Sequence, residues 1–115
     1  IEALVIGSVP ELIGYKENQT VKTSSDSVYC FTVEDNKVYA LTDSEKLQIK
    51  LRLYQLEEIL SDTFVKINQS CIANIRKIER FDTSVSGTLL IKFKNGYKDY
   101  VSRRQMKAVK ERFGL

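Results

Sequence analysis

Short runs in which apolar and polar residues alternate are the feature that most constrains this chain. Alternation with a period of two gives a β-strand one apolar face. Runs rich in β-branched and aromatic residues occupy residues 28–33 and 37–42, a third run at residues 47–51 alternates with this period, and weaker strand candidates lie at 3–6 and 19–23. Asp35-Asn36 separates the first two runs, and Asn tolerates a positive φ, so the pattern predicts a tight hairpin there. The chain is therefore expected to be mostly β.

A second hairpin is predicted closer to the C-terminus. Residues 89–94 and 97–101 alternate on either side of Asn95-Gly96. Asn-Gly between alternating strands favours a type I′ turn. Lysines lie on or near this predicted ribbon, which gives it a basic character.

Two short helices complete the predicted fold. Leucines recur at helical spacing within residues 52–61, which predicts a helix that packs on the core. A second helix is predicted over residues 103–113, where Ser102 and Gln105 form an S-x-x-Q capping box and Gly114 stops the helix. The expected fold class is mostly β with two short helices.

Length and composition bound the class of protein. The 115 residues suit one compact domain, and 43% of them are hydrophobic. No apolar run approaches the roughly 20 residues of a membrane span, and no signal peptide is evident, so a cytoplasmic location is expected. Cys30 and Cys71 lack metal-ligand spacing and lie in apolar surroundings, so we expect buried free thiols, with a redox switch as the alternative.

The residue types exclude most catalytic chemistry. The chain has no histidine, which removes Ser-His-Asp and Cys-His catalysis and histidine-ligated zinc. It also has no phosphate-binding glycine-rich loop of the P-loop or dinucleotide type. We therefore expect no enzyme, no cofactor and no metal ion.

Charge is distributed unevenly along the chain. Residues 1–62 contain 6 Lys/Arg and 11 Asp/Glu, a balance of −5, whereas residues 63–115 contain 12 Lys/Arg and 4 Asp/Glu, a balance of +8. A basic half of this kind suggests a surface for a polyanion. Arg103 and Arg104 open the predicted second helix, where positive charge opposes the helix dipole. Because this arrangement is unfavourable for the helix itself, it points to a functional role for the two arginines.

The segment at residues 64–78, FVKINQSCIANIRKI, resembles the signature of the LytTR family. A Phe and a basic residue precede a polar turn with Ser, and an apolar run with Asn follows it. The resemblance continues with the KNG of residues 94–96 and the closing YVSRRQMKAVKERFGL, and upstream with VYCFTVEDNKVYALT and LRLYQLEEIL. It covers about residues 20–115, and residues 1–19 are expected to be an N-terminal segment or strand of the same domain.

The resemblance implies packed antiparallel sheets of the LytTR type, with DNA read in successive major grooves by loops and not by a recognition helix. By position, the first loop contains Asn36 and Lys37, the second contains Lys66, Asn68, Gln69 and Ser70, and the third contains Ser102, Arg103 and Arg104. Asn68, Gln69 and Arg104 are the expected base readers, because amides suit adenine and guanidinium suits guanine. Lys66 and the hydroxyls of the two serines suit phosphates.

The resemblance also implies partners. They are double-stranded DNA with repeated half-sites, a second copy of the chain on that DNA, and a membrane-bound inhibitor protein of the kind that restrains stand-alone members of the family. Two other readings stay open on the residues alone. A single-strand or RNA binder of OB-like type also has short strands and basic ribbons, but needs aromatic residues on its basic face. A protein-interaction module predicts no salt-dependent affinity for DNA.

Overall fold

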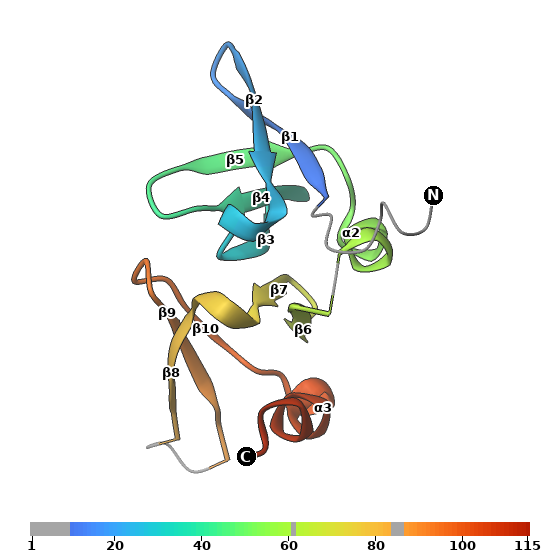
Figure 1. Cartoon of the computed structure of the whole chain (residues 1–115). Coiled ribbons are helices and arrows are strands. Elements are labelled where there is room, and N and C mark those ends of the chain that lie inside the picture. Colours follow the sequence, from blue (N-terminus) through green and yellow to red (C-terminus); the bar gives the residue numbers. More distant parts are fainter. Residues whose placement is uncertain (1–9, 61, 84–86) are drawn as a thin grey trace, which may run out of the picture.

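The structure is a computed structural model, which describes residues 10–60, 62–83 and 87–115. In these residues the chain forms two antiparallel sheets and two α-helices (Figure 1). The strands are β1 (Glu11–Lys16), β2 (Gln19–Ser24), β3 (Cys30–Glu34), β4 (Lys37–Leu41), β5 (Lys46–Ile49), β6 (Phe64–Asn68), β7 (Cys71–Asn74), β8 (Ile78–Asp82), β9 (Leu90–Phe93) and β10 (Lys98–Tyr100), and the α-helices are α2 (Leu53–Ile59) and α3 (Arg103–Phe113). The expected fold class is confirmed. The weak strand candidate at residues 3–6 lies outside the described residues.

The larger sheet has seven strands in the order β2-β1-β5-β4-β3-β7-β6. The hairpin between β3 and β4 forms as predicted: Glu34 pairs with Lys37, and the two residues between them, Asp35 and Asn36, have φ values of 52° and 63°. Two positive φ values in a two-residue turn match the right-handed twist of the strands. The turn therefore follows directly from the local sequence.

The centre of the larger sheet is buried on both faces. Cys30 and Phe31 are neighbours in β3 and both are fully buried, but they belong to different hydrophobic clusters. Ile72 and Ala73 in β7 divide in the same way. Because successive side chains of a strand point to opposite faces, β3 and β7 separate two cores.

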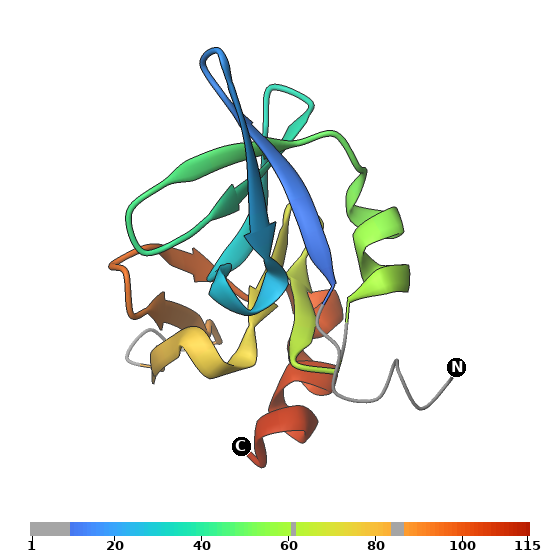
Figure 2. The same cartoon turned by 45° about the horizontal axis from the view of Figure 1, so that its top comes forward.

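Each core is closed by a different helix. Leu56 of α2 packs on the cluster that contains Phe31 and Phe64, whose ring centroids lie 5.7 Å apart. Val109 of α3 packs on the other cluster, together with Phe93 of the three-stranded sheet β10-β9-β8. Figure 2 shows the two helices on different sides of the molecule. The free thiols Cys30 and Cys71 lie in this second core, as the sequence predicts.

The turn between β9 and β10 differs from the type I′ turn that the sequence predicts. Of the Asn-Gly pair only Gly96 has a positive φ, of 95°. The Gly96 N–H donates to the Phe93 carbonyl at 2.9 Å, and the Phe93 N–H donates to the Tyr97 carbonyl at 2.8 Å, which makes a three-residue loop that ends in a left-handed glycine. The Asn95 side chain explains the change, because it accepts from the Tyr97 N–H and donates 3.1 Å to the Thr42 carbonyl of another hairpin.

Helix α3 has the predicted bounds and caps. The Ser102 hydroxyl accepts from the Gln105 N–H at 3.4 Å, and Gly114 ends the helix with a φ of 71°. In a capping box the Gln105 side chain would accept from the Ser102 N–H. Here the Ser102 N–H donates instead to the Ile67 carbonyl of β6, at 2.9 Å. The start of α3 is therefore tied to β6 by the backbone. Neither α-helix of the described residues is long and apolar enough to cross a membrane.

Candidate nucleic-acid interface

The first predicted loop is the turn between β3 and β4. Asn36 and Lys37 are both exposed there. Asn36 is the second of the two residues of this turn, and its backbone has a left-handed conformation. Close to the turn of this hairpin, the Val33 N–H donates to the Ser70 carbonyl at 3.0 Å. This bond joins the first loop to the second.

The second predicted loop is the turn between β6 and β7. Lys66 lies half-buried in β6, and Gln69 and Ser70 are exposed in the turn. Strand β6 has a register shift between Lys66 and Asn68, which is a β-bulge. Such bulges redirect side chains near the ends of strands. The turn therefore presents Gln69 to solvent with a fixed backbone on both sides.

Asn68 is held within the protein by three hydrogen bonds. Its Nδ2 donates to the Tyr100 carbonyl at 2.7 Å and to Asp99 Oδ1 at 3.2 Å. Its Oδ1 accepts from the Ser70 N–H at 2.7 Å. Since an Asn amide has two N–H donors, both are already engaged. This side chain links the second loop to the segment that leads into the third.

The third predicted loop is the junction of β10 and α3. Arg103 and Arg104 occupy the first turn of α3 and are exposed. The bond from the Ser102 N–H to the Ile67 carbonyl anchors this junction to β6. Hydrogen bonds thus connect the first loop to the second and the second to the third. The structure brings all three predicted loops to one continuous edge of the molecule.

Asp99 lies beneath this edge at the centre of a polar network. Its Oδ1 accepts from Asn68 and from the Tyr100 N–H at 2.8 Å, and its Oδ2 accepts from the Tyr97 hydroxyl at 3.2 Å. Burial, together with the negative charge of Asp99, raises the pKa of Tyr97. A hydrogen bond with Cys30, together with burial, raises the pKa of the Cys71 thiol. Both groups therefore stay neutral at physiological pH.

The first two loops share a hollow of about 540 Å³. Asn36, Lys66 and Gln69 line it, together with Arg52 and Tyr54 at the start of α2. Sequence reasoning missed these last two residues, because the leucine spacing and the acidic residues of this helix indicate a core helix with an acidic outer face. Arg52 and Tyr54, which is 64% exposed, lie on the solvent-exposed surface at the start of this helix, beside the first two loops.

The positive charges of the three loops have no ion-pair partner in the part of the chain that the structure describes. The ion pairs among the described residues join Lys16 to Glu45, Lys22 to Glu11, Lys46 to Glu34 and Arg80 to Glu79. Within the part of the chain that the structure describes, the cations of the three loops therefore lack an acidic side chain within 4.0 Å. Unpaired cations on an exposed edge suit a polyanion that carries many phosphates.

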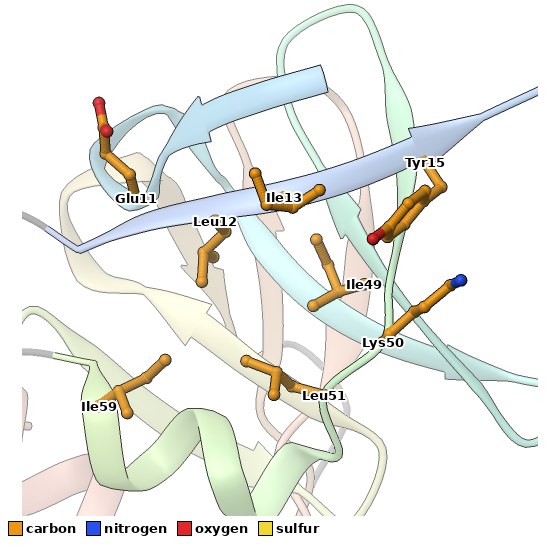
Figure 3. Close-up of a pocket in the computed structure, with 8 residues that line it drawn as sticks. All are labelled: Glu11, Leu12, Ile13, Tyr15, Ile49, Lys50, Leu51 and Ile59. Carbon is orange, nitrogen blue, oxygen red and sulfur yellow. The ribbon is translucent and has the colours of Figure 1, made fainter. Parts of the chain in front are cut away.

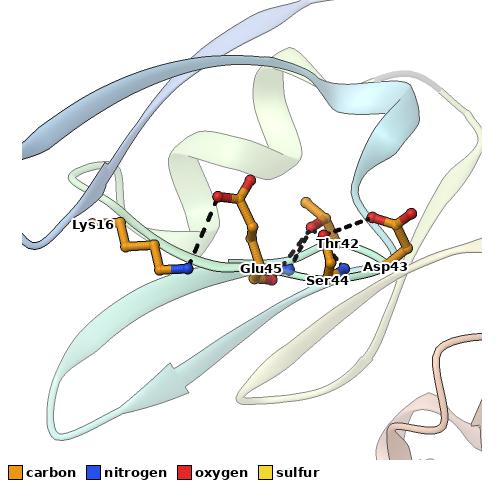
Figure 4. Close-up of polar contacts among 5 residues, drawn as sticks. All are labelled: Lys16, Thr42, Asp43, Ser44 and Glu45. Carbon is orange, nitrogen blue, oxygen red and sulfur yellow. Dashed lines mark hydrogen bonds and ion pairs between the residues drawn. The ribbon is translucent and has the colours of Figure 1, made fainter.

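Other surfaces of the molecule have a different character. Figure 4 shows the turn between β4 and β5, where Glu45 lies 4.0 Å from the Lys16 ammonium and its N–H donates to the Thr42 hydroxyl at 2.9 Å. The polar groups of that turn are thus engaged within the protein. A hollow of about 280 Å³ lies between β1 and α2, and Figure 3 shows the aliphatic side chains of Leu12 and Ile59 among those that line it. Neither place includes a residue of the three loops.

The described residues offer no metal centre and no helix-turn-helix pair. Residues 10–60, 62–83 and 87–115 contain no group of three Cys, Asp or Glu side chains that could hold a metal ion. Along the same residues, five strands separate α2 from α3. A recognition helix supported by the preceding helix is therefore not how this part of the chain is built.

Comparison with known proteins gives a consistent result. A family model described as the LytTr DNA-binding domain matches residues 18–114. Uncharacterised HTH-type transcriptional regulators of Staphylococcus aureus strains NCTC 8325 and COL are each 34% identical over 104 residues, which is 90% of this chain and 71% of each relative. The solved structure of a LytTr DNA-binding domain from Bacillus cereus superposes with a TM-score of 0.86 at 19% identity, covering 95% of this chain and 100% of that one. The chain belongs to the family of LytTr DNA-binding domains.

Proposed function

We propose that the chain binds double-stranded DNA in a sequence-specific manner, as the reader of a bacterial transcription regulator, and that it catalyses no reaction. The three loops enter successive major grooves and contact base edges there. One observation carries the proposal: hydrogen bonds tie the three loops into one edge, and among the described residues the cations on that edge have no acidic side chain within 4.0 Å. DNA is a polyanion whose grooves admit side chains held in this way.

The base readers in this proposal are side chains that are exposed on a fixed backbone. The Arg104 guanidinium can fork onto O6 and N7 of guanine, since the cap by Ser102 fixes the first turn of α3. Gln69 can pair with N6 and N7 of adenine, because it lies exposed in a turn that is held on both sides. Asn36 has the same chemistry at the first loop. Asn68, whose N–H donors are engaged, positions the turn that presents Gln69.

The remaining residues of the three loops suit the phosphate backbone. Lys37, Lys66 and Arg103 supply charge without a fixed geometry. The Ser102 hydroxyl accepts from a backbone N–H and can still donate its own hydrogen to a phosphate oxygen. The Ser70 hydroxyl can donate in the same way. Contacts of this kind orient a protein on the duplex without reading its sequence.

The proposal has consequences for partners. A domain that reads DNA from one edge should prefer repeated half-sites about one or two helical turns apart, with two copies of the chain bound on the same side of the duplex. Inserting about half a turn between the half-sites should then weaken paired occupancy. A bacterial protein whose partner is DNA works in the cytoplasm. A membrane-bound inhibitor protein is a candidate regulator of the chain.

Binding measured against salt concentration tests the proposal. Affinity for duplex DNA should fall with salt, with a log–log slope of about −3 to −6 per domain if roughly that many phosphates are neutralised. A slope near zero would contradict DNA binding and would favour a protein-interaction module.

The rival single-strand reading has one observation in its favour. Tyr54 is 64% exposed and Tyr100 is 55% exposed, and both lie beside the predicted loops. Bases of single strands stack on such side chains, at about 1–3 kcal/mol for each base. Competition between a labelled duplex and each of its separated strands decides between the readings. Preference for the duplex supports the proposal, whereas preference for the single strands overturns it.

A further inference from the structure

The three-stranded sheet carries cations that are aligned across all of its strands. Arg80 of β8 is paired with Lys92 of β9, and Lys92 is paired with Lys98 of β10. Directly paired residues of an antiparallel sheet point to the same face, and adjacent strands lie about 4.7–4.9 Å apart. These three residues, here named the cationic row, therefore place three positive charges side by side on one face.

The opposite face of this sheet is buried. Phe81, Ile91 and Asp99, which are paired with one another across the strands, face the second core and the polar network. The cationic row thus lies on the outer face, where Arg80 and Lys98 are exposed and Lys92 is half-buried.

The cationic row has little internal compensation. Arg80 lies 3.2 Å from Glu79, in an exposed ion pair. In the described part of the chain, Lys92 and Lys98 have no acidic group within ion-pair distance. Asp82 lies on the same face, two residues beyond Arg80 in β8, where it is paired with Leu90 and not with a member of the row. Like charges that are directly opposite each other in a sheet destabilise it, so a polyanion on this face would relieve a repulsion that is built into the fold.

The cationic row is continuous with the edge formed by the three loops. Tyr100 lies on the same face, two residues beyond Lys98, and a strand advances about 3.4 Å for each residue. The Tyr100 carbonyl accepts from Asn68 of the second loop, and Tyr100 is separated from Ser102 of the third loop by one residue. A duplex that lies against the third loop therefore needs to extend only a short distance to reach these lysines.

We infer that the cationic row binds the phosphate backbone of the duplex on the flank beyond the third loop. This inference rests on the proposed function and deepens it, since it assigns a second surface that strengthens binding without reading bases. The partner is the flank of the same duplex, because the row adjoins the reading edge.

The test uses the double variant Lys92→Gln/Lys98→Gln on two duplexes. One duplex is the minimal site, and the other carries at least one helical turn of random sequence on each side. The matched control is Lys16→Gln/Lys22→Gln, which removes the same charge from the other sheet, at the β1–β2 hairpin in Figure 1. Binding is measured between 50 and 200 mM salt, and thermal melting is measured without DNA.

On the flanked duplex the row variant should have a log–log salt slope shallower by about two, because each phosphate contact contributes about 0.9. Over the fourfold change in salt, this makes the ratio of wild-type to variant affinity about tenfold larger at 50 mM than at 200 mM. The control, the minimal duplex and the preference between sequences should show little change. The melting temperature of the row variant should be equal to that of the wild type or higher, since repulsion is removed.

Two results overturn the inference while the proposed function stands. One is a salt slope on the flanked duplex that the row variant leaves unchanged. The other is an equal loss on both duplexes, which places the lysines at the reading site. Vesicles with anionic phospholipid provide a further arm: if the row variant loses vesicle binding but keeps duplex binding, the row is a membrane surface and the inference is wrong. If the wild type binds no duplex, the proposed function and the inference fail together.

Discussion

Asn68→Ala separates a residue that positions a loop from one that reads a base. The substitution removes hydrogen bonds to Asp99, Tyr100 and Ser70. A neutral hydrogen bond contributes about 0.5–1.5 kcal/mol to stability and one to a charged group about 1.5–3 kcal/mol. Asn68 is only partly buried, so water replaces part of each lost bond. We expect the free energy of unfolding to fall by about 1–2 kcal/mol.

The same substitution should weaken binding to every duplex by a similar factor, because both the second and third loops lose a shared anchor. Gln69→Ala is the matched control. No hydrogen bond of the Gln69 side chain is found within the described residues, and the side chain is exposed. Its removal should change stability by less than about 0.5 kcal/mol and should relax preference at one base position.

Chemical denaturation and binding to preferred and scrambled duplexes provide the two readouts. Asn68→Asp sharpens the comparison, since it keeps the acceptor for the Ser70 N–H but sets a second carboxylate beside Asp99. It should be less stable than Asn68→Ala at neutral pH. If Asn68→Ala leaves the free energy of unfolding unchanged and relaxes preference at one base, then Asn68 reads DNA and the positioning role is refuted.

Three further predictions concern single sites. A Cβ on Gly14 would lie 2.8 Å from the Leu47 Cβ, so Gly14→Ala should destabilise the protein by about 1–3 kcal/mol in chemical denaturation, and an unchanged midpoint would refute this close approach. Thr32 is 4% exposed and its hydroxyl has no partner in the described residues, so Thr32→Val should raise stability by about 1 kcal/mol, and a loss would show that the hydroxyl is bonded. Lys66→Ala should weaken all duplexes equally and make the salt slope shallower by about one, whereas loss of preference at one base would make Lys66 a reader.

Local chemistry determined the parts of the fold that the sequence predicted well. The turn at Asp35-Asn36 needs two residues that tolerate positive φ, and both are present. Helix α3 has a capping serine, an apolar stripe and Gly114 in the left-handed conformation. These signals act over a few residues, so no tertiary contact is needed to interpret them.

Tertiary contacts determined the parts that the sequence did not predict. Strand β1 contains Gly14 and β8 contains three charged residues in five, so neither has a strong β pattern. Each forms because neighbours pair with it, β2 and β5 in one case and β9 in the other. The Asn95-Gly96 turn changed type for the same reason, since Asn95 bonds a carbonyl of a distant hairpin.

The candidate site divides in a similar way. The resemblance of the sequence to the LytTR family indicated the three loops, and the structure brings them together. The resemblance could not indicate which residues hold these loops in place. Asp99 accepts a hydrogen bond from Asn68, which lies 31 residues earlier in the chain, and only the fold brings the two together. The sequence did not indicate Arg52 and Tyr54 for a related reason. The pattern of α2 describes its buried face, whereas the proximity of these two residues to the first two loops depends on the tertiary fold.

Selection of bound duplexes from a random pool, carried out with the wild type and with Arg104→Ala, tests the central claim most directly. The wild type should enrich one motif that contains a guanine at a fixed position. Arg104→Ala should lose preference at that position, at a cost of about 1–3 kcal/mol on the preferred duplex, and keep the rest of the motif. Thermal melting should show no loss of stability, since a cation is removed from the first turn of a helix. An unchanged motif from the variant, or no motif from the wild type, would contradict reading of DNA by these loops.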